Sequence, residues 1–203
     1  MSLLTGPEID RLAKRPMPFD GRPILPHIDV SPWPGTAGPN SLDVHLSSML
    51  LVYDLPRDRY EWVTFPDGCV RFVPVLDSRK PNRTKPIPFT DEGFVFVPGV
   101  LYLGCTREVI ECHGLVPYID GRSSVGRLGV AIHKTAGRGD DGWVGALTLE
   151  ISVEEPTRLY PGDRIGQLTF HTLVGERRPY LGRYQMSSGP VASRMHLPDG
   201  ETS

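Results

Sequence analysis

Short hydrophobic runs, each ended by glycine, proline or a charged residue, recur along almost the whole chain. Where such a run alternates with polar positions, its period of two is typical of a β-strand with one packed face. The longest run, residues 164–173, is expected at the centre of a sheet. The same patterns predict further strands at 41–46, 49–53, 70–75, 94–97, 100–103, 109–111, 128–133, 146–151 and 157–160.

The run 146–151 carries one carboxylate in a hydrophobic setting. Leu147, Leu149 and Ile151 share one face of the predicted strand. Glu150 is expected on the opposite, less apolar face, because successive side chains of a strand point to opposite sides. Both a solvated glutamate and a functional carboxylate are compatible with this position.

The first 40 residues combine a short predicted helix with a proline-rich arm. Residues 7–13 are predicted to be helical, with Thr5 at the N-cap, Glu8 placed as in a capping box, and Pro16 limiting the helix. The prolines between 16 and 40 predict an extended, irregular segment. Its hydrophobic members predict that it is docked on the body: Ile24, Leu25, Ile28 and Trp33.

Composition narrows both the fold class and the function. The 203 residues include 21 prolines and 22 glycines, and frequent turns with many short β-type runs predict an all-β sandwich or barrel. A net charge of −2 gives no basic excess for nucleic acid, and no run approaches the length of a membrane span. Three cysteines and the lack of a signal pattern predict a cytosolic protein.

Anion-binding chemistry gathers in the turn 121–127. This turn supplies two guanidiniums, two hydroxyls and glycine-freed backbone amides, which together suit a phosphate, although such turns also occur as plain connections. In the nearby loop 137–142, Asp140 and Asp141 suit turn positions. Asp43 is expected to be structural and to bond a nearby turn, and His133 to be a core or interface histidine.

Four motifs in order resemble one enzyme family. GRSSVGRLG, HKTAGRGDDGWVG, LTLE and YPGDRIGQL are similar to deoxycytidine triphosphate (dCTP) deaminase, a member of the trimeric dUTPase-like superfamily. LTGPEIDRL and GPNSLDVHL resemble the family's opening, and YLGRYQMSSGPVASR resembles its tail. The resemblance covers most of the chain and is thinnest at about 14–36 and 54–92.

The resemblance implies a fold and a domain organisation. The fold is a distorted jelly-roll or β-barrel of the dUTPase-like (β-clip) type with a short N-terminal helix. Residues 1–203 would form a single domain, with a helix and extended arm at 1–40 and a tail at 176–203 that folds over the nucleotide.

The activity implied is hydrolysis of dCTP to dUTP and ammonia, in the supply of dUMP and dTTP precursors. Glu150 would be the general base that activates water, with Ser123, Arg127 and the Ala136 backbone beside the pyrimidine and the water. Gln167 would contact the nucleotide, although its amide also suits a sheet end. The substrate-binding residues implied are Arg122, Ser123, Ser124, Val125, Gly126, Arg127, Asp140, Thr148, Leu149, Glu150, Gln167, Tyr180, Arg183 and Ser187.

The resemblance also implies partners, and the sequence lacks the motifs of zinc-dependent deaminases. Mg²⁺ would arrive on the triphosphate rather than on protein side chains, dTTP is a possible inhibitor, and the chain would form a homotrimer. Zinc-dependent nucleobase deaminases carry H-x-E and P-C-x-x-C, and neither string occurs here. Glu111-Cys112-His113 has no second Cys or His pair and is not a zinc pattern.

The tail departs from the family pattern and bears on the product. Many members read K-Y-x-x-Q, whereas this chain has Arg183 for the lysine and Ser187 for the glutamine, with Gln185 earlier. A weaker grip on the phosphates favours dUTP as the released product. Three alternatives stay open: a bifunctional enzyme that yields dUMP and pyrophosphate, a dUTPase, and a catalytically silent nucleotide-binding regulator.

Overall fold

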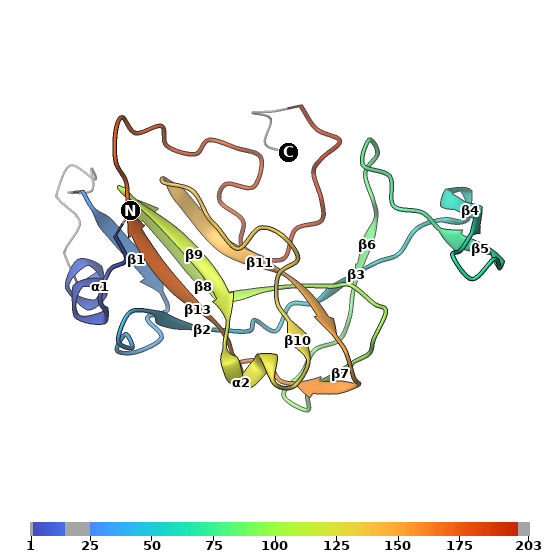
Figure 1. Ribbon diagram of the computed structural model, residues 1–203, viewed down its shortest axis with the longest axis horizontal. Helices are drawn as coiled ribbons and strands as arrows, with labels where there is room; N and C mark the ends of the chain where they lie inside the picture. Colours follow the sequence, from blue (N-terminus) through green and yellow to red (C-terminus); the bar gives the residue numbers. More distant parts are fainter. Residues whose placement is uncertain (1, 15–24, 199–203) are drawn as a thin grey trace.

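A computed structural model describes residues 2–14 and 25–198 and folds them mainly into β-strands, as the sequence predicts (Figure 1). The largest sheet has six strands and forms the long wall of the molecule. Its order is β10 (Val130–Ala131), β11 (Trp143–Val153), β8 (Tyr102–His113), β3 (Leu51–Tyr53) and β6 (Thr84–Pro86), with β1 (His27–Ser31) also paired to β8.

A three-stranded sheet packs with it. β13 (Arg164–Thr172) lies between β2 (Leu42–His45) and β9 (Leu115–Gly121), which confirms that this run is a central strand. The remaining elements are the strand pairs β7 (Phe94–Phe96) with β12 (Thr157–Leu159) and β4 (Tyr60–Thr64) with β5 (Val70–Pro74), helices α1 (Gly6–Ala13) and α2 (Ser123–Gly126), and the 3₁₀ helix η1 (Arg57–Arg59).

Strand β8 corrects the prediction of two short strands at 100–103 and 109–111, because it runs unbroken through the charged residues between them. Glu108 is fully buried there, yet its carboxylate accepts the backbone N–H of His45 at 2.9 Å and contacts His45 Nδ1 at 2.8 Å. A buried charge with such partners is tolerated, so the polar residues do not interrupt the strand.

Other elements also differ from those predicted, and β6 and β9 were not predicted at all. The strand expected at 128–133 shrinks to β10, because Gly129 turns the backbone with φ of +73° just before it. The proline-rich arm contains β1, whose Ile28 and Val30 are buried against β8. The region 54–69 contains β4, which the sequence did not predict.

Helix α1 forms as predicted but without a capping box. Thr5 makes no side-chain cap, and the Glu8 carboxylate instead binds Arg11 at 2.6 and 2.7 Å. Ile9 and Leu12 are fully buried in the core. The predictions for Pro16, Pro18, Pro23 and Ile24 lie outside the described residues.

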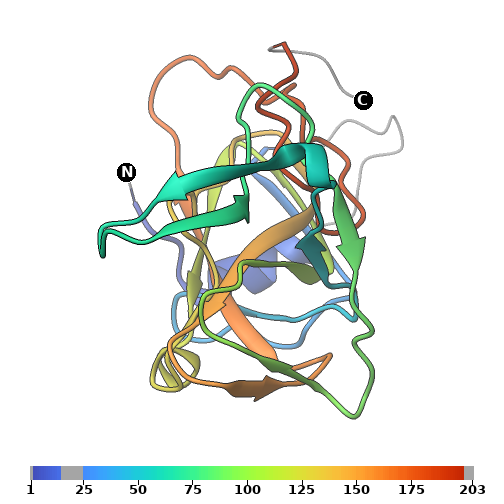
Figure 2. The ribbon, with the colours of Figure 1, turned by 90° about the vertical axis from the view of Figure 1, so that its right-hand side faces the viewer.

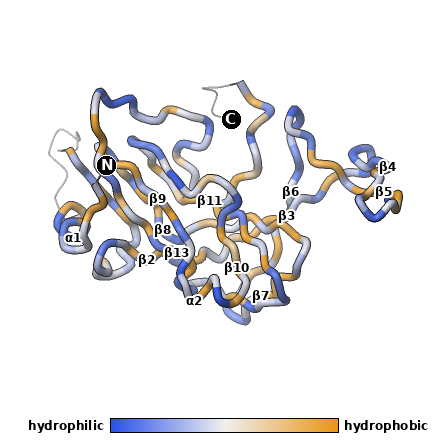
Figure 3. The backbone as a smooth tube through the Cα atoms, in the orientation of Figure 1, coloured by the Kyte–Doolittle hydropathy of each residue, from blue (hydrophilic) through white to orange (hydrophobic). Residues whose placement is uncertain are grey.

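The hydrophobic stretches follow the strands of the body, and the loop that leaves β13 is hydrophilic (Figure 3). The β4–β5 hairpin stands away from this body (Figures 1 and 2). The residues after β13, here called the tail (174–198), cross back over β11. This crossing encloses the candidate site.

Candidate active site

Beneath the tail lies a cavity of about 430 Å³ that contains the predicted base. Thr148 and Glu150 line it from β11, and Ala136 and Asp140 line it from the preceding loop. Two residues with carboxylate side chains therefore line one partly open cavity. The other lining residues are Tyr53, Leu101, Leu103, Arg138, Gly139, Trp143, Leu147, Tyr180, Tyr184, Ser187, Val191 and Ser193.

The strand β11 presents Glu150 by alternation and a bulge. Leu149 and Ile151 are fully buried, and Glu150 between them is half-buried, as the pattern predicted. The register against β8 shifts between Ala146 and Thr148. Because of this bulge, the predicted face of Leu147 is wrong. Leu147 is half-exposed and lines the cavity with Thr148, while Ala146 is buried.

Glu150 is held by the backbone rather than by a charged side chain. Its Oε2 atom accepts the backbone N–H of Lys134 at 3.1 Å, and the ammonium of Lys134 instead contacts Ser152 Oγ at 2.5 Å. Within residues 2–14 and 25–198, the Oε1 atom makes no hydrogen bond. The carboxylate is thus anchored on one side and keeps an oxygen that can accept a proton.

The loop that carries Ala136 and Asp140 is fixed against β9. Gly139 donates to the carbonyl of Pro117 at 2.8 Å, and the Gly137 carbonyl accepts the N–H of Ile119 at 2.7 Å. A Cβ atom at Gly137 would lie 2.5 Å from the Ile119 carbonyl oxygen, so only glycine fits. This close approach holds the loop against β9 and thereby sets the positions of Ala136 and Asp140.

The predicted phosphate turn forms the short helix α2 and lines a different cavity, of about 510 Å³. Arg122 pairs with Asp43 at 3.1 Å, and Gln167 donates to Asp43 at 3.1 Å. Asp43 therefore bonds the turn, in agreement with the structural role expected of it. Arg122, Ser123, Gly126 and Gln167 line this cavity; Val125 is buried in the core, and Ser124 and Arg127 are exposed.

The tail covers the Glu150 cavity through two main-chain hydrogen bonds and one hydrogen bond to a side chain of β11. Met186 donates to the Val144 carbonyl at 2.8 Å, Ala146 donates to Ser187 at 2.7 Å, and Val191 donates to Thr148 Oγ1 at 3.1 Å. The predicted residues Tyr180 and Ser187 line the cavity. Arg183 does not: its Nη1 donates to the carbonyl of Arg194 at 2.7 Å.

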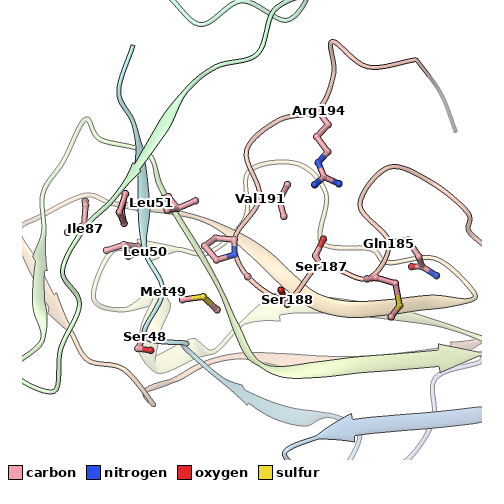
Figure 4. A pocket seen from close by; sticks show the side chains of 14 residues that line it. Ser48, Met49, Leu50, Leu51, Ile87, Gln185, Ser187, Ser188, Val191 and Arg194 are labelled. Atoms are coloured by element: carbon pink, nitrogen blue, oxygen red, sulfur yellow. The ribbon is translucent and has the colours of Figure 1, made fainter. Parts of the chain in front are cut away.

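On the other side of the tail is a larger, more open cavity of about 850 Å³ (Figure 4). Met49, Leu50, Leu51 and Ile87 line one side of it, and tail residues line the other. Ser187 and Val191 belong to both cavities. The tail is thus a partition between two hollows.

Sequence reasoning missed several residues of this region. Lys134 holds Glu150 through a backbone amide, a contact that carries no side-chain signal. Tyr53 and Tyr184 reach the cavity from β3 and from the tail, far apart in the chain. His133, expected to be a core or interface histidine, is half-buried and lines the second cavity, with Nε2 3.5 Å from Asp120 and, among the described residues, no hydrogen-bond partner for Nδ1.

Two further features bear on the predicted chemistry. Among the residues that the structure describes, no three His, Cys, Asp or Glu side chains form a metal-binding group. Cys112 is buried on one face of β8, whereas His113 turns to the other face and contacts Glu111 at 2.8 Å. No helix within the described ranges is long and apolar enough to cross a membrane.

Comparison with known proteins agrees with the motifs. The sequence model of the family described as dCTP deaminase-like matches residues 3–173. The chain belongs to the dCTP deaminase-like family. The prediction of a dCTP deaminase-type enzyme with an all-β fold is therefore confirmed at the level of the family.

Relatives within the dCTP deaminase-like family carry a more specific name. A protein of Leptospira biflexa named "dCTP deaminase, dUMP-forming" is 43% identical over 159 residues, which cover 78% of this chain and 81% of its own. Proteins with the same name from Cytophaga hutchinsonii (41% over 159 residues; 78% and 82%) and Clostridium botulinum (37% over 186 residues; 89% and 97%) are also similar. Their named product is dUMP, whereas the tail of this chain predicts dUTP as the released product.

A solved structure shares the fold. The crystal structure of 2′-deoxycytidine 5′-triphosphate deaminase from Agrobacterium tumefaciens superimposes with a TM-score of 0.55 at 20% identity. The match covers 84% of this chain and 46% of that chain, so this chain spans about half of its length. At this identity the likeness shows the shared fold alone.

Proposed function

We propose that this chain hydrolyses dCTP at two positions, removing ammonia from C4 and then pyrophosphate from the α-phosphate, to yield dUMP. One observation carries the proposal: Glu150 and Asp140 line the same cavity. A deaminase alone requires one base, and a second carboxylate beside the sugar and phosphates supplies the other. The name of the relatives in the family supports this second step.

In the first step, Glu150 acts as the general base. It takes a proton from water as the water oxygen bonds to C4, and the Ala136 carbonyl orients that water. Glu150 delivers this proton to N3, then takes the proton of the new C4 hydroxyl and passes it to the amino group, so that C4 becomes a carbonyl, the C4–N bond breaks, and ammonia leaves. The product at this stage is dUTP. No zinc takes part in this scheme.

In the second step, Asp140 activates a water in line with the α-phosphate. The new bond forms between this water and the α-phosphorus, and the bond to the bridging oxygen breaks to release pyrophosphate. Mg²⁺ carried by the triphosphate is part of the substrate and offsets the negative charge of the phosphates. The tail, which lies over the cavity, excludes bulk water during this step.

The anion-binding turn is supplied by a second copy of the chain. Arg122 and Ser123 line a cavity that shares no residue with the Glu150 cavity. A nucleotide bound at Glu150 is therefore completed by Ser123 and Arg127 of the partner subunit. A closed homotrimer provides three such sites, because each copy gives one half-site and receives the other.

The decisive experiment is incubation with dCTP and Mg²⁺, followed by chromatography and an ammonia assay. We expect dUMP, pyrophosphate and ammonia in equal amounts. Release of dUTP with ammonia, without pyrophosphate, would instead identify a deaminase that stops after the first step. A chain that converts dUTP but leaves dCTP intact would overturn the assignment of Glu150 and identify a dUTPase.

A further inference from the structure

A buried ion pair joins the start of the tail to the loop that carries Asp140. Asp141 is only 6% exposed, and its carboxylate accepts Arg177 Nε at 2.7 Å and Arg177 Nη2 at 2.6 Å. Its Oδ1 atom also accepts the N–H of Gly114 at 2.6 Å. Two parallel bonds from one guanidinium fix both distance and orientation.

The pair is charged at neutral pH. Burial acts to raise the pKa of Asp141, but the hydrogen bonds from Arg177 and Gly114 and the positive charge of Arg177 outweigh burial, so this pKa lies below its usual value. The hydrogen bond to Asp141 raises the pKa of Arg177. An unpaired charge at this depth would be costly, so each partner needs the other.

Two backbone carbonyls next to the ion pair also bind residues of the tail. The carbonyl of Asp141 accepts the N–H of Tyr180 at 2.7 Å, and the carbonyl of Gly142 accepts Gln185 Nε2 at 2.7 Å. The ring of Tyr180 packs against Trp143 in a tilted arrangement, with centroids 5.7 Å apart, and Tyr180 lines the cavity with Asp140. Asp141 and Arg177 themselves do not line that cavity.

We propose that Asp141 and Arg177 form a positioning pair that holds the tail on the Asp140 loop and thereby sets how much deaminated nucleotide is hydrolysed before release. This inference rests on the proposed formation of dUMP. Glu150 sits on β11, which is held by its ladder to β8 and not by the pair. Deamination therefore depends on the pair less than hydrolysis does, because hydrolysis needs both Asp140 and the closed tail.

The test compares Arg177→Gln, Asp141→Asn and the double variant with the wild type in Mg²⁺ and dCTP. For Arg177→Gln we expect dCTP consumption within about twofold of wild type and a roughly tenfold lower ratio of dUMP to dUTP, because small misplacements at a reacting centre are costly. The double variant should resemble Arg177→Gln rather than add a second loss. Arg177→Lys should restore part of the ratio, since it keeps the charge without the fork.

The control is Arg79→Gln, which removes an exposed arginine after β5, outside the tail and the Glu150 cavity, and should leave the ratio unchanged. Thermal melts separate a positioning role from simple destabilisation. An unchanged ratio in folded Arg177→Gln, or an equal loss of both reactions, would overturn the proposal. If the wild type releases only dUTP, the proposed product fails, and the pair is then judged by KM: a rise for dCTP at unchanged kcat supports positioning, and an unchanged KM overturns it.

Discussion

Three local features meet at the carboxylate of Glu150. Strand alternation turns it away from the buried Leu149, the bulge before Thr148 widens the space beside it, and the Lys134 amide holds one oxygen. A carboxylate held in this way accepts and returns a proton without moving. These local features favour Glu150 as the group that performs the proposed proton transfer.

Replacing Glu150 with glutamine should remove deamination and leave the fold intact. The amide oxygen of glutamine can still accept the Lys134 N–H, but the side chain can no longer take a proton from water. We expect the rate of ammonia release to fall by more than the ~10²–10⁴ typical of one acid–base group. Steady-state ammonia assays and a dCTP binding isotherm measure the two properties separately.

Glu155→Gln is the control for this change, because Glu155 is an exposed glutamate in the turn that follows β11. It should retain wild-type activity. A Glu150→Gln enzyme that keeps a tenth of the wild-type turnover would show that Glu150 is not the base.

At the scale of elements, β11 holds the tail at one position where the two backbones come close together. Gly145 on β11 has φ of +148° and forms a parallel bridge with Ser187. A Cβ atom at Gly145 would lie 2.9 Å from both the N and the O atoms of Ser187. The close approach of the two backbones therefore requires glycine.

Gly145→Ala should displace the tail from β11. We expect KM for dCTP to rise roughly tenfold, because the cavity loses its cover and the ligand its ordered surroundings. Trypsin should cleave faster at Arg183 and Arg194 in the tail. Rates of cleavage, followed by mass spectrometry, report the displacement directly.

Gly162→Ala provides the comparison for backbone strain alone. Gly162 also has positive φ, +85°, but nothing lies within 4 Å of its Cβ position. Both alanines should cost stability by about 1–2 kcal/mol, and only Gly145→Ala should expose the tail. Equal cleavage rates in the two variants would contradict the role of Gly145.

At the scale of the whole molecule, the half-sites on one chain are separate. Asp43 holds the Arg122 turn against β13, while β8 holds β11 and Glu150. The cavities that they line have no residue in common. Completion of a site by a second copy follows from this separation if both halves bind one nucleotide.

Mixed subunits should restore activity that neither parent has. Glu150→Gln and Ser123→Ala chains, unfolded together in equal amounts and refolded, should regain about a quarter of the wild-type activity, since random assembly gives about that share of sites two intact halves. Light scattering should give three times the 22.5 kDa of the chain. A mixture no more active than its parents, or a monomeric mass, would place the complete site within one chain.

Some of this structure was predictable because it depends on residues close in sequence. Alternation around Leu168 and Phe170 predicted the central strand β13. The alternation in the run ending at Ile151 predicted that Glu150 lies on the face opposite the buried residues of that strand. The prediction failed at Leu147, because a bulge depends on the register of the partner strand. It also failed in β8, where the partner of Glu108 is 63 residues away.

The sequence by itself determined the all-β class, the family and the residue types of the chemistry, because these are written in local patterns and short motifs. Only the tertiary structure decided which of those residues share a cavity. Asp140 and Glu150 line one cavity beneath the tail, Arg122 lines another, and Asp141 pairs with Arg177 across 36 positions. Such contacts depend on the path of the chain, and bulges, buried ion pairs and backbone contacts leave no periodic signal along it.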